Sequence, residues 1–482
     1  MSGAELMLTG KALKGAIWLV LSRFLGKFID FGTLIVLARI LTPADFGLVA
    51  LALILISVVD MVLEVPVLHA LLRQQTMDKA DLDTAFTLSL ARGTAFAFFI
   101  LAAAWPFAQF YEDDRLFSLL LLMSLGPFLR GLINPAMVVL AQKLSFRQTF
   151  TIEMGGKIAG TLAAIALVLS GSGYWAIASN SVVAAFVTTL GSYIIMPYRP
   201  SLTFARFSTF AGYAGWHTLS QIVAALNWQL DRFLLGRSVS QATLGTYVLA
   251  SDMAGFPVQS VVSPAMQAAT AAFSSINKDA ERLKSAFLKA SRFVMLVATP
   301  VCIGIFVTSD LAIRFVLGEK WLDAAPMLQL LAIAILPSAY LQILSAFCMA
   351  SGQPSALFKI GSVELAIRLL IVPVAIHLMA VTGMLYARLL IAAPMFLFYM
   401  LTLRRLGGIG MRAQLGNLWP VALAAVAMAI AVTLLRNELE DLALAPVIEL
   451  ALCMIVGAAT YGLVLRALGI RLPAKRFGLR YG

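Results

Sequence analysis

The sequence predicts an all-α membrane protein with about fourteen transmembrane helices, and two observations support this fold class. Of the 482 residues, 61% are hydrophobic and only 12% are charged, and the mean hydropathy is +0.92. Runs of about 20 mainly apolar residues, enough to cross a hydrocarbon layer as helix, recur along the whole chain. Because these runs leave no room for a soluble domain, we expect no nucleic-acid partner.

The first helix is expected to begin close to the amino terminus. The opening stretch MSGAELMLTGKALKGAIW has no small-residue cleavage site after a short apolar core, and its apolar run continues for a full span. We therefore expect this segment to be retained as a membrane helix. Polar, charged, glycine and proline residues then divide the chain into fourteen candidate helices. These run over 12–40, 45–72, 82–109, 115–142, 147–170, 173–197, 204–235, 243–275, 283–308, 322–350, 355–377, 380–402, 415–435 and 444–466.

The distribution of lysine and arginine predicts the orientation of these helices. If the amino terminus is cytoplasmic, the segments on its side of the membrane hold 22 basic residues and those on the other side hold 6. Cytoplasmic connections are typically the ones enriched in lysine and arginine. We therefore expect both termini in the cytoplasm.

Ionisable residues within the predicted spans indicate a polar interior. Each costs about 3 kcal/mol or more near the centre of the bilayer unless it faces a partner or a watery cavity. The embedded bases are Arg23, Lys27, Arg92, Arg130, Lys157, Arg232, Arg368 and Arg388. The embedded acids are Asp30, Asp60, Glu64, Glu153, Asp231, Asp252, Glu364 and Glu449. The three histidines are scattered and the three cysteines lie in apolar runs, so we expect no metal site.

An internal repeat organises the predicted helices. At an offset of 198, Trp18, Arg39 and Gly47 fall on Trp216, Arg237 and Gly245. The stretch EMGGK at 153–157 later falls on ELAIR at 364–368, at an offset of 211. A slowly growing offset is expected for a duplicated unit with longer loops in its second copy. We predict a lobe of helices 1–6 (1–200), a lobe of helices 7–12 (201–408) related by a parallel repeat, and two extra helices with a basic cytoplasmic tail (409–482).

The stretch LARILTPADFGLVALA (37–52) resembles the opening of bacterial polysaccharide flippases of the Wzx type, which export exopolysaccharide or lipopolysaccharide. Their superfamily includes lipid II flippases and multidrug antiporters, with two lobes around a V-shaped central cavity. The resemblance implies inner-membrane transport of an undecaprenyl-diphosphate-linked oligosaccharide from the cytoplasmic to the periplasmic leaflet, by alternating access without ATP. Membrane lipids and a polysaccharide polymerase with its export machinery are the other expected partners. We expect neither enzymatic activity nor a cofactor.

Two other function classes compete with this interpretation. A cation-coupled multidrug or small-molecule antiporter of the same superfamily would be favoured by a cavity dominated by acids, and the eight embedded bases argue against it. A membrane glycosyltransferase or polymerase would normally need long loops outside the membrane, and the connections here are short.

Embedded bases are the candidate residues for binding diphosphate. Arg23 and Lys27 are four residues apart and therefore share a helix face, and the planar guanidinium fork of arginine suits phosphate oxygens. The alternative is that this pair extends to the membrane surface. Arg92 and Arg130 could instead pair with acids. The full candidate set is Arg23, Lys27, Arg92, Arg130, Lys157, Arg368 and Arg388.

Embedded acids are candidates for ion coupling or for charge pairs. Asp60 and Glu64 share a face, which in a low dielectric favours protonation of one of them, although salt bridges to arginines would explain both. In EMGGK and ELAIR, an acid and a base four residues apart could brace each lobe or could line the cavity. The full candidate set is Asp30, Asp60, Glu64, Glu153 and Glu364.

Overall fold

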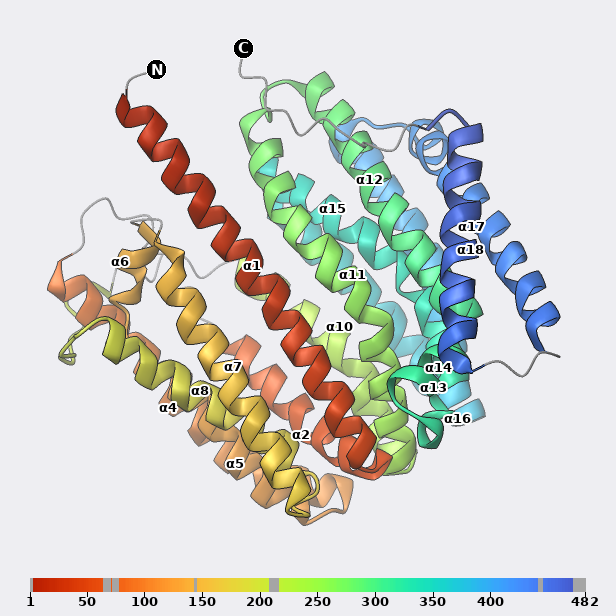
Figure 1. The fold of residues 1–482 in the computed structure, drawn as a ribbon. Coiled ribbons are helices and arrows are strands. Elements are labelled where there is room, and N and C mark those ends of the chain that lie inside the picture. Colours follow the sequence, from red (N-terminus) through yellow and green to blue (C-terminus); the bar gives the residue numbers. More distant parts are fainter. Residues whose placement is uncertain are drawn as a thin grey trace. The chain divides into compact units, whose positions relative to one another are not determined.

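The computed structural model describes residues 3–63, 71, 78–142, 145–207, 216–440 and 445–470. Within these residues every regular element is a helix (Figure 1). The chain divides into two compact units. Unit 1 comprises Met1–Val248 and Gly361–Val381, and unit 2 comprises Leu249–Ile360 and Thr382–Gly482.

Unit 1 is a bundle of helices in which neighbours in space are often distant in sequence. Helix α1 packs on α7, α7 on α8, α8 on α5, α5 on α4 and α2, and α2 on α10. Its helices are α1 (Gly3–Ile40), α2 (Pro43–Val62), α4 (Lys79–Tyr111), α5 (Arg115–Gly131), α6 (Met137–Gln142), α7 (Phe146–Leu169), α8 (Trp175–Ile195) and α10 (Trp216–Ser238).

The turn between α1 and α2 shows how the sequence sets a helix boundary. The backbone N–H of Asp45 donates to Oγ1 of Thr42 at 3.3 Å, and the backbone N–H of Thr42 donates to the Asp45 carboxylate at 2.9 Å. This reciprocal pair is a capping box, and Pro43 follows at the first helical position, where its missing N–H costs nothing. The TPAD stretch therefore begins α2 sharply.

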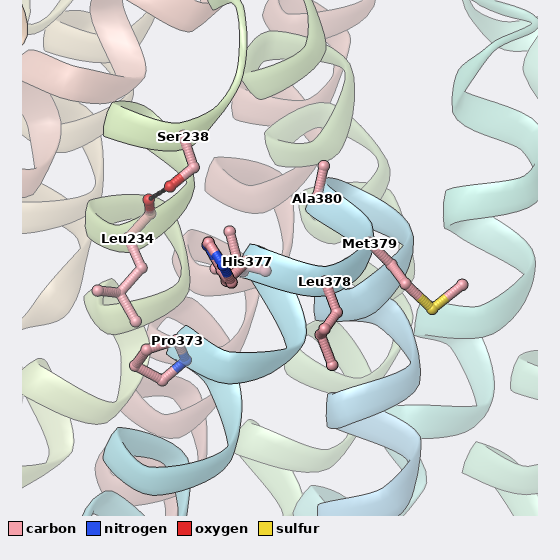
Figure 2. A pocket seen from close by; sticks show the side chains of 8 residues that line it. Leu234, Ser238, Pro373, His377, Leu378, Met379 and Ala380 are labelled. Carbon is pink, nitrogen blue, oxygen red and sulfur yellow. Dashed lines mark hydrogen bonds between the residues drawn. The ribbon is translucent and has the colours of Figure 1, made fainter.

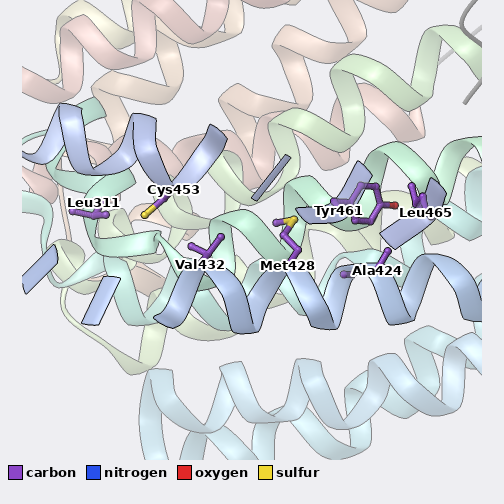
Figure 3. Close-up of a cluster of buried hydrophobic side chains, with 8 residues drawn as sticks. Leu311, Ala424, Met428, Val432, Cys453, Tyr461 and Leu465 are labelled. Carbon is purple, nitrogen blue, oxygen red and sulfur yellow. The ribbon is translucent and has the colours of Figure 1, made fainter. Parts of the chain in front are cut away.

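Unit 2 is built around α12, which packs on α14, α15, α17 and α18. Figure 3 shows the buried apolar cluster that joins α17 and α18, including Met428, Val432, Cys453 and Tyr461. The remaining helices are α11 (Gln241–Ser275), α12 (Ala280–Val307), α13 (Ser309–Val316), the short 3-10 helix η1 (Glu319–Trp321), α14 (Ala324–Ala334), α15 (Leu336–Ala350), α16 (Pro354–Gly407), α17 (Met411–Glu440) and α18 (Pro446–Ala467). Of these, α11 begins in unit 1, and α16 passes from unit 2 into unit 1 and back.

The predicted helix ends agree with the observed ones where polar, glycine or proline residues separate neighbouring apolar runs. The predicted spans 147–170, 173–197 and 283–308 correspond to α7, α8 and α12 with ends that differ by three residues or fewer. The predicted span 322–350 is divided into α14 and α15 at Ile335, just before Leu336 and Pro337 open the second helix, and together they form one membrane-capable span. The predicted span 115–142 likewise divides into α5 and α6.

The expected break between the eleventh and twelfth predicted helices is a kink within α16. Met379 and Ala380 have non-helical backbone angles, and Ala380 has a φ of 49°. Among the described residues, nine helices are long and apolar enough to cross a membrane. The count of fourteen spans and the V-shaped cavity stay predictions.

Helices α2 and α11 meet through two glycines. A Cβ atom on Gly47 would overlap the backbone oxygen of Gln241, and a Cβ atom on Gly245 would overlap the backbone oxygen of Pro43. Gln241 and Gly245 lie 198 residues after Pro43 and Gly47. Reciprocal contacts of this kind are those that two copies related by a two-fold axis make. Such contacts would follow from the proposed repeat, which stays a prediction together with its lobe boundaries.

Candidate functional site

Polar side chains join α1 to α7. The Ser22 hydroxyl donates to the Glu153 carboxylate at 2.6 Å, and Lys157 Nζ lies 2.6 Å from Oδ2 of Asp30. One turn further along α7, the hydroxyls of Thr33 and Thr161 are 2.7 Å apart. Glu153, Lys157 and Thr161 are spaced by four residues and therefore share the helix face that meets α1. Hydrogen bonds, rather than apolar contact alone, thus hold this pair of helices together.

The expected pair within EMGGK does not form. Lys157 binds Asp30 and Glu153 accepts from Ser22, so each residue finds its partner on α1 rather than on its own helix. The reason is the space above Gly26, where a Cβ atom would lie 3.1 Å from Cε of Lys157. The missing side chain lets the lysine stem lie across α1 and reach Asp30.

Arg23 and Lys27 remain without partners in the described part of the chain. Both are exposed, and neither forms a hydrogen bond or an ion pair with a described residue. Together with Asp30, whose side chain is 53% exposed, they occupy one side of α1. This side carries two cations within a predicted span and is available to an anionic ligand.

A second ion pair joins α2 to α4. Arg92 Nη2 lies 2.7 Å from Oδ1 of Asp60, which is the pairing alternative considered for these residues. On α5, Arg130 has an exposed side chain that forms no hydrogen bond or ion pair with a described residue. Glu64, expected beside Asp60, lies outside the described residues.

The charges on α10 and α16 form a partly buried network. Arg368 lies 2.6 Å from Glu364 and 3.5 Å from Asp231, and it donates to the backbone oxygen of Asn227 at 3.0 Å. Asp231 is 2% exposed and also accepts from the Tyr247 hydroxyl at 3.2 Å. Glu364 and Arg368 thus form the ion pair that their four-residue spacing allows. Several partners around one arginine are typical of a structural brace, and the role of the pair stays a prediction.

The sequence did not indicate two members of this network. Asn227 lies four residues before Asp231, so its place on the same face of α10 could have been inferred from spacing. Nothing in the sequence links Tyr247 to Asp231. Arg388 lies in the part of α16 that belongs to unit 2, where it is half-buried.

A pocket of about 600 Å³ lies between α10 and the kink of α16, within unit 1. Figure 2 shows the imidazole of His377 beside Leu234 and Pro373, with Ala380 at the kink. The Ser238 hydroxyl donates to the backbone oxygen of Leu234 at 2.9 Å, so its proton is already engaged. No residue of the predicted site lines this pocket.

Charged and polar groups join the loop after α4 to the end of α10 and the start of α11. Asp113 accepts from Arg115 Nη2 at 2.7 Å and from Gln241 Nε2 at 2.5 Å, while Arg237 lies 2.8 Å from Glu112. Burial alone would raise the pKa of Asp113, but the hydrogen bonds from Arg115 and Gln241 outweigh it and lower that pKa below its usual value. Asp113 is therefore held as a carboxylate.

Comparison with known proteins identifies the family. Residues 36–326, more than half of the chain, match the family model described as polysaccharide biosynthesis protein. The succinoglycan biosynthesis transport protein ExoT of Rhizobium meliloti (strain 1021) is 28% identical over 320 residues, which cover 66% of this chain and 65% of ExoT. The lipopolysaccharide biosynthesis protein WzxC of Escherichia coli (strain K12) is 23% identical over 357 residues, 72% of each chain.

Solved structures show the same fold. The lipid II flippase MurJ, in its inward closed conformation, matches with a TM-score of 0.74 at 13% identity, covering 95% of this chain and all of MurJ. An inward-facing multidrug resistance MATE family transporter of the MOP superfamily matches with a TM-score of 0.62 at 14% identity, covering 80% of this chain and 96% of that one. The chain is therefore a multi-pass membrane protein with the fold of the MOP superfamily, and it belongs to the polysaccharide biosynthesis protein family.

Proposed function

We propose that this protein is a flippase that carries an undecaprenyl-diphosphate-linked oligosaccharide from the cytoplasmic to the periplasmic leaflet of a bacterial inner membrane. The family match and the names of the transport proteins it resembles support the substrate class. The observation that carries the proposal for this chain is the side of α1 that presents Arg23 and Lys27 without partners among the described residues. We propose that this side binds the diphosphate.

An unpaired charge within the membrane is energetically costly. Cations within a membrane span need a counter-ion or water, and Asp30, the acid on the same side of α1, is already engaged by Lys157. A diphosphate would supply the missing negative charge, and the fork of Arg23 could bind two of its oxygens at once. Arg130, exposed and without a hydrogen bond to a described residue, could add a further cation.

The pairing of the embedded acids argues against the competing antiporter function. A carrier of cationic drugs needs acids that are available to its substrate. Asp60, Asp30 and Glu364 are engaged by Arg92, Lys157 and Arg368, respectively. The bases without partners in the described part of the chain are the ones that favour an anionic substrate.

We further propose that transport proceeds by alternating access, with both termini in the cytoplasm. The contact between α2 and α11 belongs to equivalent positions of the two proposed lobes, so separating these helices would open one side of the path between the lobes. A polysaccharide polymerase and export machinery would then use the translocated product. No ATP-binding step is needed in this scheme.

The test is complementation of a deletion strain in the source organism. The strain should lose surface polysaccharide and accumulate lipid-linked oligosaccharide, and the wild-type gene should restore export. The double variant Arg23→Gln/Lys27→Gln should fail to restore export although its abundance in the membrane is normal. Arg147→Gln is the matched control, because Arg147 is an exposed cation in the first turn of α7 without a side-chain partner among the described residues.

Two results would contradict different parts of the proposal. Normal export by the double variant would exclude the α1 cations as the diphosphate site. Unchanged polysaccharide and lipid-linked oligosaccharide in the deletion strain would exclude the function itself.

A further inference from the structure

A basic pocket of about 480 Å³ lies in unit 2, where α16 ends, α17 begins and both meet the first turns of α12. Its lining includes Lys284, Lys289 and Arg292 from α12 and Asn417 from α17, together with the backbone of 408–410. It lies at the end of these helices that the distribution of basic residues assigns to the cytoplasm. None of its lining residues belongs to the predicted substrate site.

The pocket has an excess of positive charge. Its one acid, Glu281, lies 2.8 Å from Lys284 and neutralises it. Lys289 is exposed and forms no hydrogen bond or ion pair with a described residue. Arg292 donates only Nε, to the backbone oxygen of Asn417 at 3.3 Å, so its two terminal nitrogens lack partners in the described part of the chain. Two cations are thus available to one anion.

Buried hydrogen bonds fix the walls of this pocket. Asn417 is 6% exposed, and its Nδ2 donates to the backbone oxygen of Leu288 at 2.8 Å and to Oγ of Ser291 at 3.1 Å. These bonds tie α17 to α12 on either side of Lys289, and the bond to Arg292 orients its guanidinium. The backbone that carries both cations, and the guanidinium of Arg292, are therefore fixed by the fold.

An exposed apolar side chain follows the cations of the pocket on α12. Phe293 is 44% exposed and lies four residues after Lys289, on the same side of the helix. Helix α12 is long and apolar enough to cross a membrane. An anion with an apolar tail would satisfy the cations and this side chain together, whereas a free phosphate would satisfy only the cations.

We propose that this pocket binds the phosphate of an anionic phospholipid, one of whose acyl chains lies along Phe293. Basic pockets between membrane helices on the cytoplasmic side bind phospholipid head groups in this way. The bound lipid would join α12, α16 and α17 and would stabilise the folded chain by mass action. This role is separate from the proposed flipping of lipid-linked sugar.

The test measures thermal unfolding of the full chain in detergent as short-chain phosphatidylglycerol is added. Phosphatidylcholine with the same chains and inorganic phosphate are the comparison ligands. We expect phosphatidylglycerol alone to raise the midpoint. The concentration needed should rise about fivefold in Lys289→Gln and about 25-fold in Lys289→Gln/Arg292→Gln, from the usual contribution of one basic residue near an anionic lipid.

The matched control is Lys278→Gln/Arg282→Gln, which removes two cations at the same end of α12 from positions that do not line the pocket. It should respond to phosphatidylglycerol as the wild type does. Because Lys289 is exposed, the Lys289→Gln variant should unfold at the wild-type midpoint when no lipid is added. A pocket-variant response equal to wild type, an equal loss in the control, or an equal shift with phosphatidylcholine would overturn the proposal. An equal shift with inorganic phosphate would show a free-anion site instead.

Discussion

The ion-pair partner of Lys157 is determined by the packing of a neighbouring helix. Its spacing from Glu153 allows a pair within α7, yet Asp30 on α1 binds it instead. The choice depends on Gly26, which leaves room for the lysine stem. In α16, by contrast, Glu364 and Arg368 pair as their spacing predicts. The buried Asp231 forms a second ion pair with the same arginine.

The Asp30–Lys157 pair predicts mutual rescue. Asp30→Asn or Lys157→Gln alone should lower both export and the thermal unfolding midpoint, because each leaves one charge without its partner. The exchange Asp30→Lys/Lys157→Asp should recover part of the loss, with a coupling free energy of about 1 kcal/mol for a half-exposed pair. Double-mutant analysis of unfolding and of polysaccharide export measures this coupling.

The control exchanges the residues that spacing alone would have paired. Glu153→Lys/Lys157→Glu should show no recovery relative to its single variants, since Glu153 accepts from Ser22 and not from Lys157. Recovery in this exchange but not in the first one would contradict the observed pairing.

Helix α7 has two adjacent glycines, Gly155 and Gly156, with different surroundings. A Cβ atom on Gly156 would overlap Oγ1 of Thr188 on α8 and would lie 2.8 Å from the backbone oxygen of Ala184. A Cβ atom on Gly155 would meet nothing within 4 Å. Close packing of helices through small residues is typical of membrane proteins, and here Gly156 and not Gly155 provides it.

We therefore expect opposite effects from the same substitution at neighbouring positions. Gly156→Ala should destabilise the protein by about 1–3 kcal/mol, because the α7–α8 contact becomes overpacked. Gly155→Ala should be neutral or stabilising by up to about 1 kcal/mol, since alanine favours helix. Thermal or denaturant unfolding in detergent compares the two. Equal destabilisation by both variants would contradict the assignment of the packing face.

The hydrogen bonds of Asp113, in the loop after α4, predict that the stability of the folded chain depends on pH. The pKa of Asp113 is lowered in the folded chain, so its hydrogen bonds contribute stability above the usual carboxyl value of 3.8 and lose it as the pH falls through the lower folded value. Asp113→Asn should therefore unfold more readily than wild type at pH 7, and the difference should shrink only below pH 3.8. Asp114→Asn is the control, because the exposed Asp114 carboxylate has no side-chain partner among the described residues. A difference that stays constant down to pH 3 would exclude this role for Asp113.

At the scale of the whole molecule, the sequence predicted the class of fold and the family better than it predicted the contacts of the candidate site. Hydropathy and turn residues determine where helices lie, because these signals are local. Which helix faces meet is decided by three-dimensional packing, so the pairing of Asp60 with Arg92 remained one of two alternatives. The place of Tyr247 beside Asp231 could not be inferred at all.

The orientation of the whole chain can be tested with single added cysteines. The three natural cysteines are free and buried, so they should give little background. A thiol reagent that does not cross the inner membrane should label Asp114→Cys in cells with a permeable outer membrane and should label Lys278→Cys only after lysis. The reverse pattern would place both termini outside the cytoplasm and would contradict the orientation inferred from the basic residues.

The reciprocal glycines of α2 and α11 have a genetic consequence. The obstacle to a side chain at Gly47 is a backbone carbonyl of Gln241, and the obstacle at Gly245 is a backbone carbonyl of Pro43. A clash with a side chain can be relieved by a smaller side chain, but every amino acid carries the same carbonyl. Suppressors of Gly47→Ala should therefore be reversions at codon 47 rather than changes in the opposing helix, and the same holds at codon 245.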